Sequence, residues 1–174
     1  MSKFVKAFAA LALTASIGLT DAHADDHEEL NIETVGDEAA DAAFGKADAL
    51  NTKLLDGQKT LDAIKAKVAD AADDATVLKG AETDLTALAA DLKSVPDDIK
   101  AIIDEAKGIK LSGNFITKAK KGKAVISNVA QLDKVTKNAD ALIEAVSATT
   151  TEVAESAKAA AEKAAEAAGE DTGQ

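Results

Sequence analysis

Apolar residues recur along this chain at alternating three- and four-residue steps, which is the spacing of a helix face buried against other helices. One column repeats every seven positions and comprises Leu50, Gly57, Ile64, Ala71, Leu78, Leu85, Leu92, Ile99 and Ala106. A second column interleaves with it and comprises Ala47, Leu54, Leu61, Val68 and Ala75, then Leu88, Val95, Ile102 and Ile109. The same signal returns at Val125, Leu132, Ala139, Val146, Val153 and Ala160. The pattern therefore predicts an all-α protein.

Helix-start and helix-stop signals divide this pattern into helices over 37–78, 83–107 and 114–168, with an end near Asp73 as the alternative for the first helix. We expect Asp37 to cap the first helix, because a short side-chain oxygen at that position accepts an unpaired backbone N–H. Pro96 predicts a kink or a new helix start within the second helix, since proline is tolerated in a first helical turn. Gly108 is expected to end that helix.

At two further positions the sequence allows either a helix break or a continuous helix. Lys79-Gly80 followed by Thr83 is typical of a helix end and a new cap, yet the apolar column keeps its phase there, which equally suits a continuous helix. Thr149 and Glu152 have the spacing of a capping box, which predicts a break near Thr149 as the alternative to one long final helix.

The expected architecture is an up-and-down bundle of three or four long Ala-rich amphipathic helices, because short connections make successive helices antiparallel neighbours. The alternative is an extended antiparallel coiled-coil hairpin that turns at 108–113 and needs a second copy to cover its apolar face. Aromatic residues make up only 2% of the chain, so the core is expected to consist of Leu, Ile, Val and Ala.

Residues 1–24 have the features of a secretory signal peptide. Lys3 and Lys6 precede an apolar run over 7–19, and residues 22–24 (Ala-His-Ala) supply a small-x-small cleavage site. The alternative is a membrane anchor, but the run is shorter than the roughly 20 apolar residues that span a bilayer. We expect a periplasmic or secreted protein that has no transmembrane segment after cleavage.

The mature chain is expected to comprise an acidic flexible tail at 25–36, a helical bundle domain at 37–168 and a disordered C-terminus at 169–174. The formal net charge of −11 becomes −12 when Lys3, Lys6 and Asp21 leave with the signal peptide. This charge disfavours duplex nucleic acid as a partner, because phosphate binding needs a basic footprint. The absence of Cys excludes disulfides, thiol nucleophiles and thiolate metal sites.

One basic segment departs from the acidic average. It contains Lys107, Lys110, Lys118, Lys120, Lys121 and Lys123, and no acidic residue occurs between Glu105 and Asp133. Phe115 and Ile116 lie among these lysines, as does Leu111. Apolar groups surrounded by cations can settle on an anionic membrane or envelope polymer. The alternative interpretation is a solvated helix connection, or a segment that neutralises the acidic tail of the same molecule.

Cleavage after Ala24 would start the mature chain with Asp25-Asp26-His27. This start resembles the amino-terminal copper- and nickel-binding motif, and the resemblance covers these three residues. It implies a square-planar Cu(II) or Ni(II) site formed by the free amino group, two amides and the His27 imidazole. The alternative is that a histidine stands at the third position by chance.

Other motifs of catalysis are absent from the sequence: no histidine lies in the expected bundle and the glycines are scattered singly. Adjacent carboxylates such as Asp97-Asp98 are interpreted as solvated charges at helix ends. We expect a non-enzymatic protein and carry three hypotheses. It is an envelope-associated structural or interaction module that contacts an anionic surface or an unknown protein, a periplasmic holdase chaperone or carrier of amphipathic ligands, or an N-terminal Cu(II)/Ni(II) binder. Each is compatible with a homo-oligomer.

Overall fold

The computed structural model describes residues 30–71 and 74–170. Four helices occupy these ranges, and no strand occurs in them: α2 (Glu38–Ala71), α3 (Ala75–Leu92), α4 (Val95–Lys107) and α5 (Phe115–Glu170). The all-α prediction is thus confirmed.

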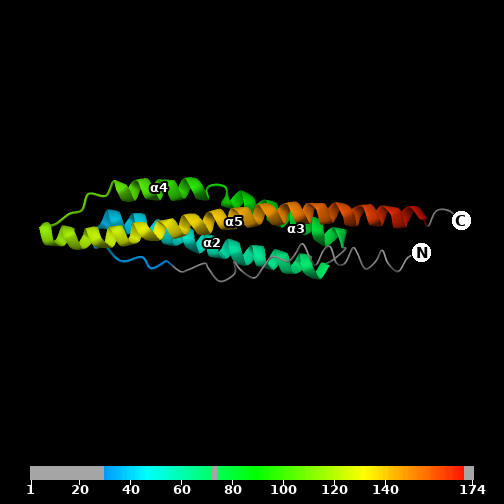
Figure 1. Ribbon diagram of the computed structural model, residues 1–174, viewed down its shortest axis with the longest axis horizontal. Coiled ribbons are helices and arrows are strands. Elements are labelled where there is room, and N and C mark those ends of the chain that lie inside the picture. The colour runs from blue at the N-terminus through cyan, green and yellow to red at the C-terminus, as the bar shows by residue number, and fades with distance from the viewer. Residues whose placement is uncertain (1–29, 72–73, 171–174) are drawn as a thin grey trace.

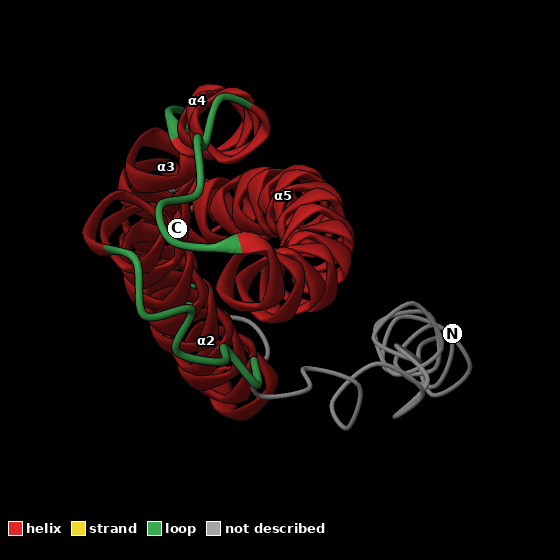
Figure 2. Cartoon of the chain, turned by 90° about the vertical axis from the view of Figure 1, so that its left-hand side faces the viewer, coloured by secondary structure: helices red, strands yellow, loops and turns green. Residues whose placement is uncertain are grey.

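The helices form a bundle with three arms. α2 is the first arm, α3 and α4 follow one another as a broken second arm, and α5 is the third (Figure 1). α5 contacts α2, α3 and α4, while α2 also contacts α3 and α4, so the arms enclose a common core, as the end-on view shows (Figure 2). The up-and-down bundle is confirmed, and the two-armed hairpin is excluded because α2 packs against both other arms.

Every helix contributes to the core, which among the described residues consists of Leu, Ile, Val and Ala side chains and one aromatic ring, Phe44, which is 0% exposed. Gly57 sets a close approach between α2 and α5. A Cβ added there would lie 3.0 Å from Leu142 Cδ2. Small residues at such positions let helix backbones approach closely, which compensates for the scarcity of large side chains.

The turn between the first two arms lies near the earlier of the two ends predicted for the first helix. α2 ends at Ala71 and α3 begins at Ala75, with Asp74 as its N-cap, whose Oδ1 accepts from Thr76 N at 2.9 Å. The predicted turn over 79–83 is wrong, because these residues lie inside α3 and the Thr83 hydroxyl donates to the Lys79 carbonyl at 3.0 Å. An aspartate caps a helix more strongly than a threonine, because its charge also complements the helix dipole.

The other predicted helix ends and helix starts agree with the structure. α3 ends at Leu92, and α4 starts at Val95 with Pro96 in its first turn. Gly108 is the C-cap of α4, and its backbone N–H donates to carbonyls of the last turn. Asn114 precedes α5 and its side-chain oxygen accepts from Thr117 N at 2.9 Å, as expected of a helix start.

α5 continues unbroken past Thr149. The Thr149 hydroxyl donates to the Ala145 carbonyl at 2.8 Å within the helix, so the residue does not act as a cap and, of the two alternatives, one long final helix is correct. At about 1.5 Å per residue the 56 residues of α5 span about 84 Å, and its last turns extend beyond the other arms (Figure 1). None of the helices described here is long and apolar enough to cross a membrane.

Candidate functional site

The basic segment lies at one end of the bundle, where α4 passes into α5. We call this region the basic tip and define it as residues 107–126: the last residue of α4, the linker 108–114 and the first turns of α5. It occupies the far left of the molecule in Figure 1, away from the α2–α3 turn. The lysines of the basic segment therefore lie together at one end of the bundle.

Most of the predicted lysines on this tip face solvent. The exposed ones are Lys107, Lys110, Lys118, Lys120 and Lys123. Lys107 Nζ lies 3.8 Å from Asp104 Oδ1, an exposed contact within α4. Pairs of this kind contribute little, so the tip keeps a positive field.

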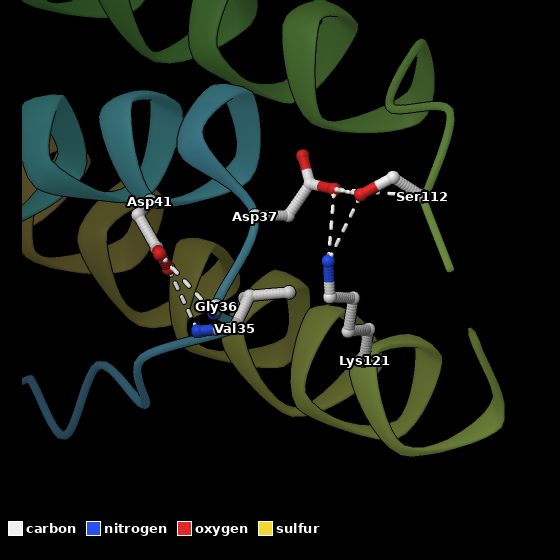
Figure 3. A network of polar contacts seen from close by, with 6 residues as sticks. All are labelled: Val35, Gly36, Asp37, Asp41, Ser112 and Lys121. Atoms are coloured by element: carbon white, nitrogen blue, oxygen red, sulfur yellow. Dashed lines mark hydrogen bonds and ion pairs between the residues drawn. The ribbon is translucent and has the colours of Figure 1, made fainter. Parts of the chain in front are cut away.

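Lys121 differs from the other lysines because it points inward. Its Nζ lies 3.3 Å from Asp37 Oδ2 and 3.1 Å from Ser112 Oγ (Figure 3). Its side chain is 13% exposed and that of Asp37 is 10% exposed. Lys121 is therefore a structural contact between α2 and α5, not a surface cation.

Asp37 joins three segments of the chain. Besides Lys121, its Oδ2 accepts from Ser112 N at 3.2 Å and from Ser112 Oγ at 2.9 Å (Figure 3). Asp37 stands directly before α2, as expected of a cap, but the hydrogen bonds of its side chain go to the linker and to α5 instead of to the first turn of the helix. Hydrogen bonds from the Ser112 backbone and hydroxyl, then from Lys121, hold the pKa of Asp37 below its ordinary value, against a smaller opposing effect of burial.

This contact predicts an acid-sensitive tip. A carboxylate whose folded pKa is lowered contributes stability that is present above its unfolded pKa, 3.8 for this group, and is lost as the pH falls through the folded pKa. In Asp37→Asn that contribution is absent, so the melting temperature should lie below that of the unaltered protein at about pH 6, and the difference should shrink towards about pH 3. Thermal unfolding followed by circular dichroism measures the melting temperatures of the variant and of the unaltered protein at each pH.

Asp48→Asn is the matched control, because Asp48 is an exposed carboxylate on α2, the helix that Asp37 precedes. It should show no pH-dependent difference from the unaltered protein. A difference for Asp37→Asn that stays constant across the pH range would contradict the assignment.

Residues 30–36 lie against α5, although the sequence placed them in a flexible tail. Asn128 binds this segment through two hydrogen bonds. Glu33 N donates to Asn128 Oδ1, and Asn128 Nδ2 donates to Glu33 O, both at 2.8 Å. Val35 is 6% exposed and belongs to the core, and Leu30 and Ile32 pack against it. These three apolar residues were the signal in the sequence from which the packing of this segment could have been predicted. Residues 25–29 lie outside the described part.

The start of α2 is supported from within this segment. The two carboxylate oxygens of Asp41 accept from Val35 N at 2.7 Å and from Gly36 N at 3.1 Å (Figure 3). Gly36 has φ +70°, a conformation that glycine adopts without strain. The segment and the first turn of α2 therefore form one ordered unit next to the basic tip.

Large apolar side chains are exposed on the tip. Phe115 is 87% exposed, Ile116 67% and Ile126 74%. Phe115 and Ile116 were predicted, whereas Ile126 was missed; it stands one position after Val125 and so falls off the buried column. Leu111, also expected on this surface, is partly buried against the core.

Two adjoining grooves lie between the first two arms. The first, of about 420 Å³, lies between α2 and α4 and is crossed by the 2.7 Å ion pair of Lys46 with Glu105. The second, of about 430 Å³, lies between α2 and α3. Ala49 and Lys53 line both grooves.

No group of three or more His, Asp or Glu residues that could hold a metal ion occurs among the described residues. Asp25, Asp26 and His27 lie outside these ranges, so the copper or nickel site stays a prediction from the sequence.

Comparisons with known proteins do not assign a family. No family model matches the sequence, and neither a curated protein nor a solved structure matches it.

Proposed function

We propose that this chain is an exported, non-catalytic helical protein that acts as an envelope-associated interaction module and contacts an anionic surface through its basic tip. The observation that supports this most directly is the exposure of Phe115 at 87% and Ile126 at 74% among surface lysines, in a bundle whose other large apolar side chains are mostly covered. Exposed apolar patches of this kind mark interaction sites.

The charge distribution favours end-on contact. The tip carries five exposed lysines and no acidic residue, while the whole chain has a net charge of −11. An anionic surface therefore attracts the tip and repels the remainder of the bundle. Each lysine near an anionic lipid surface contributes about 1 kcal/mol. The protein should accordingly approach with the tip first.

Co-sedimentation of residues 25–174 tests the proposal. The protein is mixed with vesicles of phosphatidylglycerol and phosphatidylcholine, with vesicles of phosphatidylcholine alone, and in parallel with immobilised polyphosphate. Salt-sensitive binding to an anionic surface is expected, and the triple change of Lys118, Lys120 and Lys123 to Gln should weaken it by about a hundredfold. Lys121 is left intact because it supports the fold.

A charge-matched control changes Lys79, Lys93 and Lys158 to Gln, since these exposed lysines lie elsewhere on the bundle. This variant should bind as the unaltered protein does. Absence of binding to vesicles and polyphosphate alike would overturn the proposal, as would equal weakening by both triple variants.

A second candidate, a carrier of amphipathic ligands, is favoured by the groove between α2 and α4. Its lining combines the buried apolar residues Leu50 and Ile102 with exposed charged residues, namely Lys46, Lys53, Asp98 and Glu105. Saturable binding of a fluorescent fatty acid that Ala49→Trp blocks, and that the Lys118, Lys120 and Lys123 variant leaves intact, would favour this candidate over surface contact.

A further inference from the structure

Building on the proposed function, we infer that the anionic surface is a lipid bilayer, and that the outer face of the first turns of α5 lies in its headgroup region with Phe115, Ile116 and Ile126 inserted. The proposed function requires only an anionic surface, which a soluble polyanion also offers. The inference adds that an apolar phase covers these three side chains.

The geometry of α5 places the three side chains on one face. At about 100° per residue, Phe115, Ile116 and Ile126 fall within an arc of about 100°. The exposed residues Ala119, Lys123 and Ala130 share this arc. The buried Asn128 and Leu132 lie on the opposite side, against the other arms. The apolar face therefore points directly away from the bundle.

Lysines border this face in the arrangement of an interfacial helix. Lys118 lies on one side of the arc, Lys120 on the other, and Lys123 within it. Their long apolar stems can lie along inserted side chains while the ammonium groups reach lipid phosphates. A polyphosphate chain would satisfy these lysines but would leave the phenyl ring of Phe115 in water.

The face changes character farther along the helix, which limits the depth of insertion. Asp133 and Glu144 lie at the angular positions of Phe115 and Ile126, Asp140 lies about 20° outside the arc, and all three are exposed. Anionic lipid repels these carboxylates. Only the first turns of α5, about 24 Å of helix from Phe115 to Ala130, should enter the interface, so the bundle stands tilted on its tip.

A second copy of the chain is a poorer fit to this face. Pairing two identical tips would bring five exposed lysines of one copy against five of the other, and no acidic residue occurs between Glu105 and Asp133 to compensate. Like charges placed opposite each other oppose association. An anionic bilayer neutralises the lysines and covers the apolar groups together.

Single-tryptophan variants test insertion directly, because the chain contains neither Trp nor Tyr. Phe115→Trp and Ile126→Trp should show a blue-shifted emission with phosphatidylglycerol vesicles and quenching by lipids brominated on the acyl chains. Ala148→Trp is the control, since Ala148 is exposed on the same face of α5 beyond the acidic boundary. Its emission should stay that of a tryptophan in water.

A triple change of Phe115, Ile116 and Ile126 to Ser measures what the apolar groups contribute. Because these side chains are 87%, 67% and 74% exposed, the variant should fold as before, which circular dichroism checks. Binding to the vesicles should weaken at least tenfold, whereas binding to polyphosphate should not change.

The outcomes separate the inference from the proposed function. Lysine-dependent binding to vesicles without a shift in emission overturns insertion and leaves the anionic-surface proposal intact. Binding to polyphosphate but not to vesicles also overturns the bilayer. A concentration-dependent dimer that shields the tryptophan at position 115 without lipid would replace the bilayer by a second copy. Absence of all anionic binding overturns both proposals.

Discussion

Phe44→Ala should lower the free energy of unfolding by about 3–5 kcal/mol, the range for removing a buried aromatic ring. Phe44 is 0% exposed, and it is the one aromatic side chain in the described core. Its neighbours along α2 on the same face, Ala40 and Ala47, are too short to fill the space that the ring leaves. The cavity should therefore persist. Chemical denaturation followed by circular dichroism measures the loss.

Phe115→Ala is the matched control for this prediction. It removes the same ring from a position that is 87% exposed, so the free energy of unfolding should change by less than about 0.5 kcal/mol. A loss of less than about 1 kcal/mol for Phe44→Ala would mean that the Ala-rich bundle collapses around the missing ring.

Asn128→Ala should release residues 30–36 from α5. Asn128 is 0% exposed, and its side chain forms two hydrogen bonds with the backbone of Glu33. Alanine leaves that N–H and carbonyl without their partner, at a cost of about 1–3 kcal/mol. Hydrogen exchange at the Glu33 amide should accelerate by roughly tenfold to a hundredfold, while amides in the middle of α5 keep their protection.

Asn31→Ala provides the comparison, because Asn31 is an exposed asparagine in the same segment. Its exchange should match that of the unaltered protein. Uniformly faster exchange throughout α5 in Asn128→Ala would show that the two hydrogen bonds of Asn128 support the whole bundle and not residues 30–36 alone.

Local signals in the sequence predicted those features that depend on neighbouring residues. Pro96 lacks a backbone N–H and so starts α4 within its first turn, and Asn114 supplies the side-chain oxygen at the start of α5. The stop signal at Lys79-Gly80 and the capping-box spacing at Thr149 do not end a helix. Both stretches lie inside helices because tertiary packing of the apolar face outweighs such weak stop signals.

The sequence predicted most of the residues that make up the candidate site, but it did not predict which of their side chains face solvent. Phe115 and Ile116 are exposed as expected, whereas Lys121, counted among the surface lysines, bonds Asp37 at a separation of 84 residues. No local pattern distinguishes Lys121 from Lys120. Ile126 was missed for the converse reason: an isoleucine within a periodic helix is ordinarily assigned to its buried face.

By itself, the sequence determined the all-α class, the helix faces and the position of the basic tip, because helical periodicity and charge runs are properties of residues a few positions apart. Only the tertiary structure decided which residues of that tip face outward, how Asp37 links α2 to the linker and α5, and where residues 30–36 lie. These features depend on contacts between segments 84 and 95 residues apart, such as Asp37 with Lys121 and Glu33 with Asn128. Such pairs form only when the packing of the arms sets their register, which local spacing does not encode.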